Sequence, residues 1–178
     1  MHDAVPVSFR LPMHQELRFQ SLQSILRGIK MSHDEQIATL NDLIETCKKG
    51  EERFRMGSEG AGDPHLKTEL SNRARNCAQS ARELQDLVLS LGGELANHSS
   101  VSGALHRRWI DIKAAILGKD DEAILTECEH GEDLAVRSYR RALDKNLLVH
   151  SVVDRQYQGV LQNHDAVKKL RDRLRGGS

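Results

Sequence analysis

The short pattern Cys-x-x-Gly-Glu occurs twice in this chain, 81 residues apart, from Cys47 to Glu51 and from Cys128 to Glu132. Around each copy, apolar residues recur at the spacing of one helix face, and both glutamates fall on that face. A carboxylate on a buried face is costly unless it is paired, hydrogen-bonded or bound to a cation. The repeat therefore predicts two helices whose glutamates meet in a core, and this layer is the candidate site.

Residues that start and stop helices mark the ends of the apolar patterns. Ser32 and Glu35 form a capping box before the first pattern. Asp63 and Pro64 open the second with an N-cap and a proline at the first helical position, and a glycine pair closes it. The only tryptophan, Trp109, lies in a shorter pattern. We expect helices over about residues 33–57, 64–91, 121–144 and 151–174, and a helical connection over 101–117.

The expected elements are two antiparallel helix pairs joined by a long crossing segment, which is the topology of ferritin-like proteins. The composition agrees, because charged residues are frequent (29%) but balanced and aromatic residues are few (3%). We therefore predict an all-α fold, a ferritin-like up-down four-helix bundle with a long helical crossover between helices 2 and 3. The bundle is expected over residues 32–175, followed by a tail of residues 176–178.

Residues 1–31 differ from the rest of the chain. Pro6 and Pro12 interrupt any early helix, and apolar and basic residues are then mixed over residues 17–30. We expect an N-terminal extension that is poorly ordered or forms a basic amphipathic helix. Met31, directly before the capping box, also suits a start of translation.

Charge and hydropathy argue against several classes of function. The formal net charge is zero, so no overall field attracts nucleic acid, and no nucleic-acid partner is expected. No apolar run reaches the ~18 residues of a membrane span, so no transmembrane segment is expected. The three cysteines lie in helical apolar patterns, which predicts reduced, buried thiols and a cytoplasmic location. A homo-oligomer is compatible with the sequence, which identifies no protein partner.

Several short stretches spread over residues 33–174 occur together in one combination. They are LNDLIE at 40–45, GE at 50–51, VSGALHRRW at 101–109, GED at 131–133, RQYQGV at 155–160 and NHD at 163–165. With these stretches the chain resembles a bacterial ferritin-like four-helix-bundle family that is known only as a domain of unknown function. The resemblance implies the bundle fold and no established activity.

The wider ferritin-like group implies iron ligands only in part. Its di-iron members carry one glutamate on each of two helices and Glu-x-x-His on each of the other two. Glu51 and Glu132 match the two single glutamates. His164 lies where a helix histidine would bind, but Leu161 replaces the glutamate three residues before it, and residues 77–80 of the second helix contain neither Glu nor His. A standard di-iron site is therefore disfavoured.

Two interpretations of the buried glutamates remain. Glu51, Glu132 and His164 could hold one metal ion, because carboxylate and imidazole suit Fe or Mn. The favoured alternative has no cofactor, and the carboxylates are instead paired inside the core in a neutral arrangement that fixes helix register. The members of this core charge network are Glu51, Glu132, Arg73, Arg155 and Tyr157.

The sequence contains no phosphate-binding loop, nucleophile elbow or paired CxxC motif, which favours a protein that is not an enzyme. The leading hypothesis is a non-catalytic ferritin-like bundle with a degenerate metal site and a structural or stress-related role. The stress element rests on the fold group alone. A second hypothesis is an Fe- or Mn-binding oxidase or iron-handling protein that uses Glu51, Glu132 and His164. A third is an interaction module that docks through its N-terminal helix.

Overall fold

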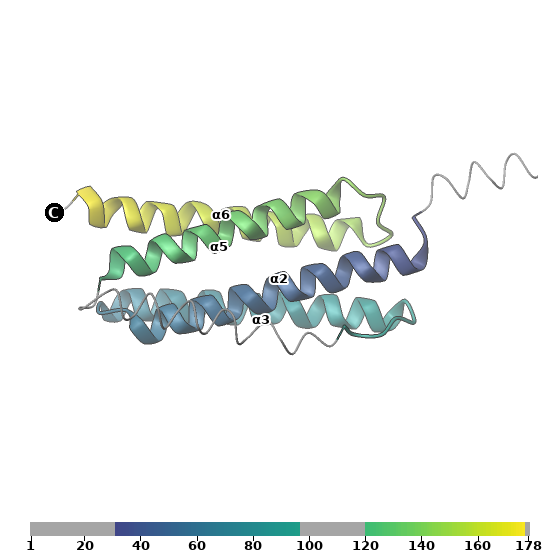
Figure 1. Ribbon diagram of the computed structural model, residues 1–178, viewed down its shortest axis with the longest axis horizontal. Coiled ribbons are helices and arrows are strands. Elements are labelled where there is room, and N and C mark those ends of the chain that lie inside the picture. The colour runs from purple at the N-terminus through teal and green to yellow at the C-terminus, as the bar shows by residue number, and fades with distance from the viewer. Residues whose placement is uncertain (1–30, 97–119, 177–178) are drawn as a thin grey trace, which may run out of the picture.

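The computed structural model describes residues 31–96 and 120–176. Four long helices run lengthwise beside one another in these ranges (Figure 1). They are α2 (His33–Gly60), α3 (Pro64–Ser90), α5 (Asp121–Leu143) and α6 (His150–Gly176). The described residues contain no strand, so the expectation of an all-helical, four-helix fold is confirmed.

The predicted caps are present. The hydroxyl of Ser32 accepts a hydrogen bond from the Glu35 amide (3.2 Å), and the Glu35 carboxylate accepts one from the Ser32 amide (3.0 Å), which completes the capping box of α2. Asp63 caps α3 by accepting from the His65 amide (2.8 Å), with Pro64 at the first helical position. Local sequence therefore fixes where these two helices begin.

Helix α2 continues to Gly60, beyond the glycine at position 57 where we expected it to end. Gly57 is buried within the helix, at a close approach of three side chains from neighbouring helices. A Cβ built on Gly57 would lie 3.3 Å from Cys128 Sγ, from Ile124 Cγ2 and from Leu70 Cδ1. This glycine therefore allows close packing and does not end the helix, because packing against α3 and α5 outweighs its low helix propensity.

The helices pack as two pairs. Helix α2 packs along α3, α5 packs along α6, and α2 and α5 join the two pairs. Helices α3 and α6, both fully within the described ranges, make no comparable contact with each other. The bundle is therefore more open between α3 and α6 than along its other seams.

The core is divided into two hydrophobic clusters along the bundle. One cluster contains the fully buried Leu40, Leu84 and Tyr139, and the other contains the fully buried Leu70 and Leu125. On each helix, the interval between the two clusters carries the polar residues of interest, which are Glu51 and Arg53 on α2, Cys77 on α3, Glu132 on α5 and His164 on α6. A polar layer thus separates two apolar ends.

The end of α3 and the start of α5 lie at opposite ends of the bundle. The segment after α3 is held beside the start of α2, because the Asn41 side chain bonds the Glu94 carbonyl (3.0 Å) and the Ala96 amide (3.1 Å). The start of α5 is held at the α2–α3 turn, where the Asp121 carboxylate accepts from the Gly62 amide (2.6 Å). The crossover predicted over 101–117 lies outside the described residues, as does the extension over 1–30.

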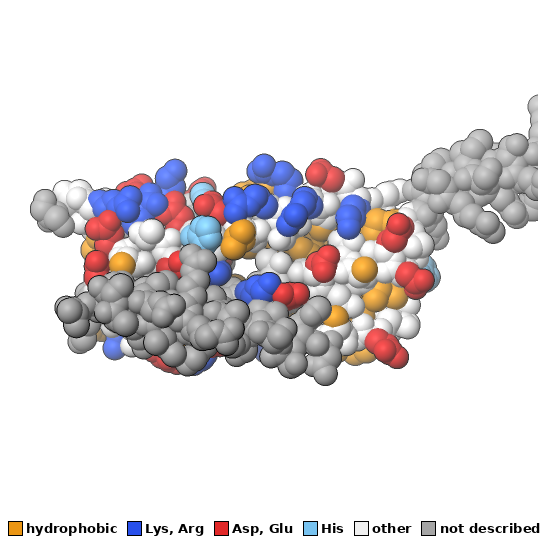
Figure 2. Space-filling view, in the orientation of Figure 1, with side chains coloured by type: hydrophobic (Ala, Val, Ile, Leu, Met, Phe, Trp, Pro, Cys, Tyr) orange, Lys and Arg blue, Asp and Glu red, His pale blue; other side chains and the backbone are white. Residues whose placement is uncertain are grey.

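Charged side chains of both signs are interspersed over the face seen in Figure 2, in keeping with the formal net charge of zero. Among the described residues, none of the helices is both long and apolar enough to cross a membrane.

Candidate functional site

Glu132 of α5 is the most deeply buried candidate, with 3% of the residue exposed. Its Oε2 atom has no hydrogen-bond partner among the described residues. Burial raises the pKa of this carboxyl to about 7, although the positive charges of Arg73, Arg53 and His164 act to lower it. Charged groups from the three other helices therefore act on one buried carboxyl.

Arg53 of α2 lies against α5 beside this carboxyl, and our sequence reasoning missed it. It is 8% exposed, and its Nε lies 3.5 Å from Glu127 Oε1. The guanidinium occupies the space beside Gly131, where a Cβ would lie only 2.6 Å from Arg53 Cζ. The glycine of the second Cys-x-x-Gly-Glu copy thus provides the recess that receives an arginine. The sequence feature that could have indicated a buried Arg53 is the pair Gly50 and Gly57, which flank it at helical spacing on α2.

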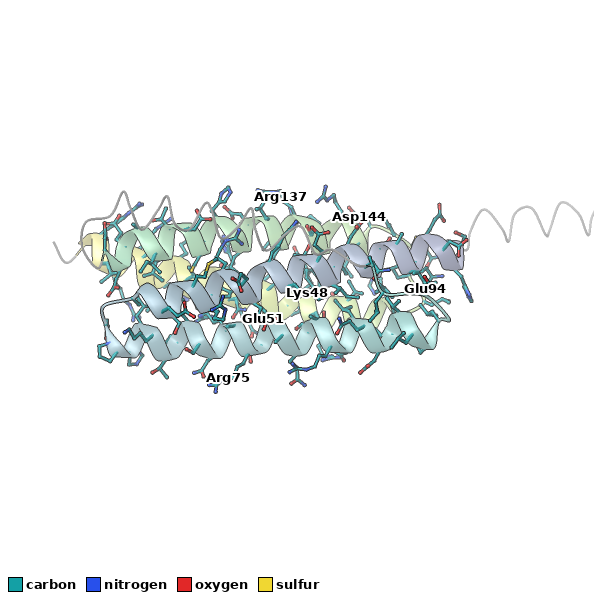
Figure 3. All side chains as sticks on the ribbon, turned by 60° about the horizontal axis from the view of Figure 1, so that its bottom comes forward. Lys48, Glu51, Arg75, Glu94, Arg137 and Asp144 are labelled. Carbon is teal, nitrogen blue, oxygen red and sulfur yellow. The ribbon has the colours of Figure 1, made fainter. Side chains whose placement is uncertain are left out.

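The two copies of the repeat are not equivalent. Glu132 is buried, whereas Glu51 is only half-buried on α2 (Figure 3). Gly50 faces α3, since a Cβ there would lie 3.2 Å from Cys77 Sγ. The negative charge of Glu51 reaches the same thiol and contributes to raising the pKa of Cys77. Glu51 therefore lies near the polar layer, on the seam between α2 and α3.

Of the predicted network partners, Arg73 reaches the layer. Its Nη1 donates to Asn163 Oδ1 of α6 (2.7 Å), and its Nη2 lies 3.3 Å from Glu69 Oε2. Arg155 does not contact it: the side chain is 64% exposed and pairs with Glu83. Tyr157 is half-buried, and its hydroxyl accepts from Arg140 (3.3 Å).

His164, the third predicted metal ligand, has a carboxylate at each ring nitrogen. Its Nε2 lies 3.1 Å from Asp133 Oδ1, and its Nδ1 lies 3.2 Å from Asp165 Oδ1. The described residues contain no group of three or more His, Cys, Asp or Glu side chains arranged to hold a metal ion. His164 acts electrostatically to lower the pKa of Glu132, so these two of the three predicted ligands lie near each other, although no contact joins them among the described residues.

A buried polar chain crosses the bundle next to the layer. Cys47 Sγ lies 3.1 Å from Tyr139 Oη, and Tyr139 Oη donates to Gln156 Oε1 at 2.7 Å. Burial raises the pKa of Cys47 to about 11 and that of Cys128 to about 12. These thiols are therefore protonated at neutral pH and are poor nucleophiles.

A cleft of about 710 Å³ opens between α3 and α6, at the seam where these two helices approach each other least closely. Glu132 lines this cleft together with Cys77 and Tyr139. Its rim carries the charged residues Arg82, Glu83, Asp86 and Arg155. Among the described residues, the cleft thus opens toward the polar layer from one side of the bundle.

The fold and site define a four-helix bundle with a polar layer in its core and a cleft leading to that layer. The chain matches the family model described as a domain of unknown function (DUF2383) over residues 35–145, and it belongs to this family. The matched range contains α3, α5 and all but the first two residues of α2, and so includes both copies of Cys-x-x-Gly-Glu. A comparison with curated proteins gave no match. The expected membership of a domain of unknown function is confirmed, and the ferritin-like relationship stays a prediction.

Proposed function

We propose that this protein is a non-catalytic bundle with a structural role, in which the buried charge layer around Glu132 fixes how the helices align. The observation that carries this proposal is the close packing of the Arg53 side chain, on α2, against Gly131, on α5. A buried arginine that fits only beside a glycine specifies one register, because a shift by one turn would place it against a side chain. Such layers contribute specificity more than stability.

Arg73 supplies a second link of the same kind. It joins α3 to α6 through Asn163, across a seam with few backbone contacts that Gln156 also bridges by donating to Glu83 (2.7 Å). With Arg53 joining α2 to α5, both helix pairs are connected at one level of the bundle.

The chemistry of the described side chains supports a non-catalytic role. Cys47 and Cys128 are buried thiols whose pKa burial raises, so neither is an activated nucleophile. His164 has carboxylates at both ring nitrogens, which leaves neither nitrogen open to a substrate. A stress-related role rests only on the resemblance to ferritin-like proteins. The ferritin-like topology is supported by the placement of the end of α3 and the start of α5 at opposite ends of the bundle.

A double variant, Arg53→Met with Glu127→Gln, tests the structural role because it removes both charges of the buried ion pair while keeping similar volume. We expect it to remain helical by circular dichroism but to give broadened or multiple amide signals in NMR spectra, as helices adopt more than one alignment. The matched control is Arg155→Met with Glu83→Gln, which removes an exposed ion pair. A layer variant with a single, fully dispersed set of signals would refute the proposal.

The second candidate is the metal-binding function, with Fe or Mn on Glu51, Glu132 and His164. The observation in its favour is that the charge of His164 acts on Glu132 across α5 and α6. Metal analysis of protein purified without chelator, repeated for Glu51→Ala with Glu132→Ala, tests it. A stoichiometric ion that is lost in the double variant would favour this function over the structural one.

The third hypothesis concerns docking through the N-terminal helix, whose residues lie outside the described ranges. Binding to liposomes or captured partners is compared with and without residues 1–30. Equal binding of the two forms would remove this hypothesis.

A further inference from the structure

The cleft between α3 and α6 contains an unbalanced negative charge. On the rim, Arg155 pairs with Glu83, and the charges of Arg82 and Asp86 offset each other. Glu132 remains as the one further charged residue of the lining. With Glu132 ionised, the described side chains that line the cleft therefore sum to one negative formal charge, which lies at the buried side.

The arginines near Glu132 offset only part of this charge, because each also has another carboxylate partner. Arg53 lies beside Glu127, and Arg73 lies beside Glu69. No ion pair joins Glu132 to either arginine among the described residues, and its Oε2 accepts no hydrogen bond there. A buried carboxylate oxygen without a donor favours a ligand that brings both a positive charge and N–H groups.

The composition of the cleft narrows the class of ligand. A metal ion would need several ligating side chains at one point, and the described residues offer no group of three. An ammonium group needs acceptors only, and the lining adds the hydroxyl and carboxamide groups of Ser80 and Asn163 to the carboxylate. Ala135 and Val160 provide apolar surface for a short carbon chain.

We propose that the α3–α6 cleft binds a primary ammonium group on a short aliphatic chain, with the Glu132 carboxylate as its anchor. The volume of about 710 Å³ lies in the range of small-molecule sites. The proposed role of the layer in helix alignment does not depend on this ligand, because helix alignment is tested on the protein without any ligand.

Titration of the ¹⁵N-labelled full chain with n-butylammonium tests the proposal by NMR. A ligand with so few atoms is expected to bind with a dissociation constant of about 1 mM. Saturable shifts are expected at the amides of Gly50, Ser80 and Gly159, which line the cleft on three sides. Neutral 1-butanol, which has the same carbon chain, is expected to bind at least about tenfold more weakly.

Three variants locate the binding. Glu132→Gln is expected to weaken n-butylammonium binding by about tenfold or more, whereas Asp86→Asn on the rim changes it by less than about twofold. Gly159→Leu is expected to block the cleft without touching Glu132, because a Cβ at Gly159 meets no atom within 4 Å. Loss of binding in this variant supports the cleft even if Glu132→Gln is altered elsewhere.

Four results would overturn the proposal. They are shifts that do not saturate, equal binding of 1-butanol, equal binding by Glu132→Gln, and binding that survives Gly159→Leu. Titration with MnCl₂ is a separate arm. Line broadening centred on Glu132 at micromolar Mn²⁺ would assign the site to a metal ion and reject the amine.

Discussion

Replacing Glu132 by Gln should make the protein more stable at neutral pH, even though the residue is buried among arginines. The pKa of this carboxyl rises from an ordinary value of 4.5 to about 7 in the folded protein, chiefly because burial disfavours the charged form. The folded state therefore holds a proton that the unfolded chain has already released between these two pH values. Stability from this group is fully present below pH 4.5 and is lost as the pH rises to about 7.

The size of the effect follows from the shift. Each pH unit of difference corresponds to about 1.4 kcal/mol, so a rise from 4.5 to about 7 amounts to roughly 3 kcal/mol. Gln resembles the protonated carboxyl in shape and has no charge to bury. Glu132→Gln should therefore be more stable than the unmodified protein by about 3 kcal/mol at pH 8, which corresponds to a rise in Tm of about 6–12 °C.

The assay is chemical denaturation of both proteins at several values between pH 5 and 8, because the difference between them cancels the titration of all other groups. The stability gap should be smallest at pH 5 and should widen until about pH 8. Glu94→Gln is the matched control, since it removes the same charge at an exposed position near the end of the bundle (Figure 3). A Glu132→Gln protein that is less stable at pH 8, or whose gap does not depend on pH, would refute the reasoning.

Three further predictions follow from the packing. Gly131→Ala should lower the free energy of unfolding by about 3 kcal/mol, because the new methyl group displaces the Arg53 side chain. Gly159→Ala should raise the free energy of unfolding by about 0.5–1 kcal/mol, because a Cβ there meets no atom within 4 Å. Urea denaturation measures both variants, and equal effects would contradict the close packing of Arg53 against Gly131. Tyr139→Phe should cost about 1–2 kcal/mol in the same assay, since Gln156 loses its donor, and no loss would exclude that hydrogen bond. Glu51→Gln should be tolerated better than Glu51→Ala in thermal unfolding, because it keeps polarity and size, and the reverse order would contradict a polar setting.

Most of the helical framework could be predicted from the sequence, because its signals are local. The capping box at Ser32 and the Asp63 and Pro64 pair satisfy backbone groups within a few residues, and the structure shows both. The end of α2 could not be predicted in the same way. Gly57 is a stop signal by propensity, and only the packing of Cys128 and Leu70 against it explains why the helix continues.

The candidate site was predictable only in part, because helical spacing gives a face but no partner. Arg155 was placed in the core layer, yet Val153 and Gln156 are the buried residues of that turn, which directs Arg155 outwards. Arg53 was overlooked because an arginine on a helix is usually exposed. Its burial depends on the absence of a side chain at Gly131, which belongs to a different helix.

The Cys-x-x-Gly-Glu pattern that the two repeat copies share also did not determine their burial. Gly50 faces the thiol of Cys77, whereas Gly131 faces the guanidinium of Arg53, so the two glutamates that follow them have different neighbours. The structure leaves Glu51 half-buried and Glu132 buried. A repeat therefore indicates where to look for a site, and the surrounding helices decide which copy carries it.

The cost of burying Glu132 bears on what the residue is for. A carboxyl whose ionised form lowers stability at neutral pH does not serve the fold as a simple stabilising pair, since Arg53 and Arg73 already have other partners. Two other roles could explain why a carboxyl is buried here, namely alignment of the helices and binding of a cation. The Glu132→Gln variant distinguishes these two roles, because its stability, its NMR spectrum and its ligand binding are measured separately. If this variant is more stable but no longer binds n-butylammonium, the carboxylate serves the cleft. If it is more stable and its NMR signals lose their single set, the carboxylate serves the alignment.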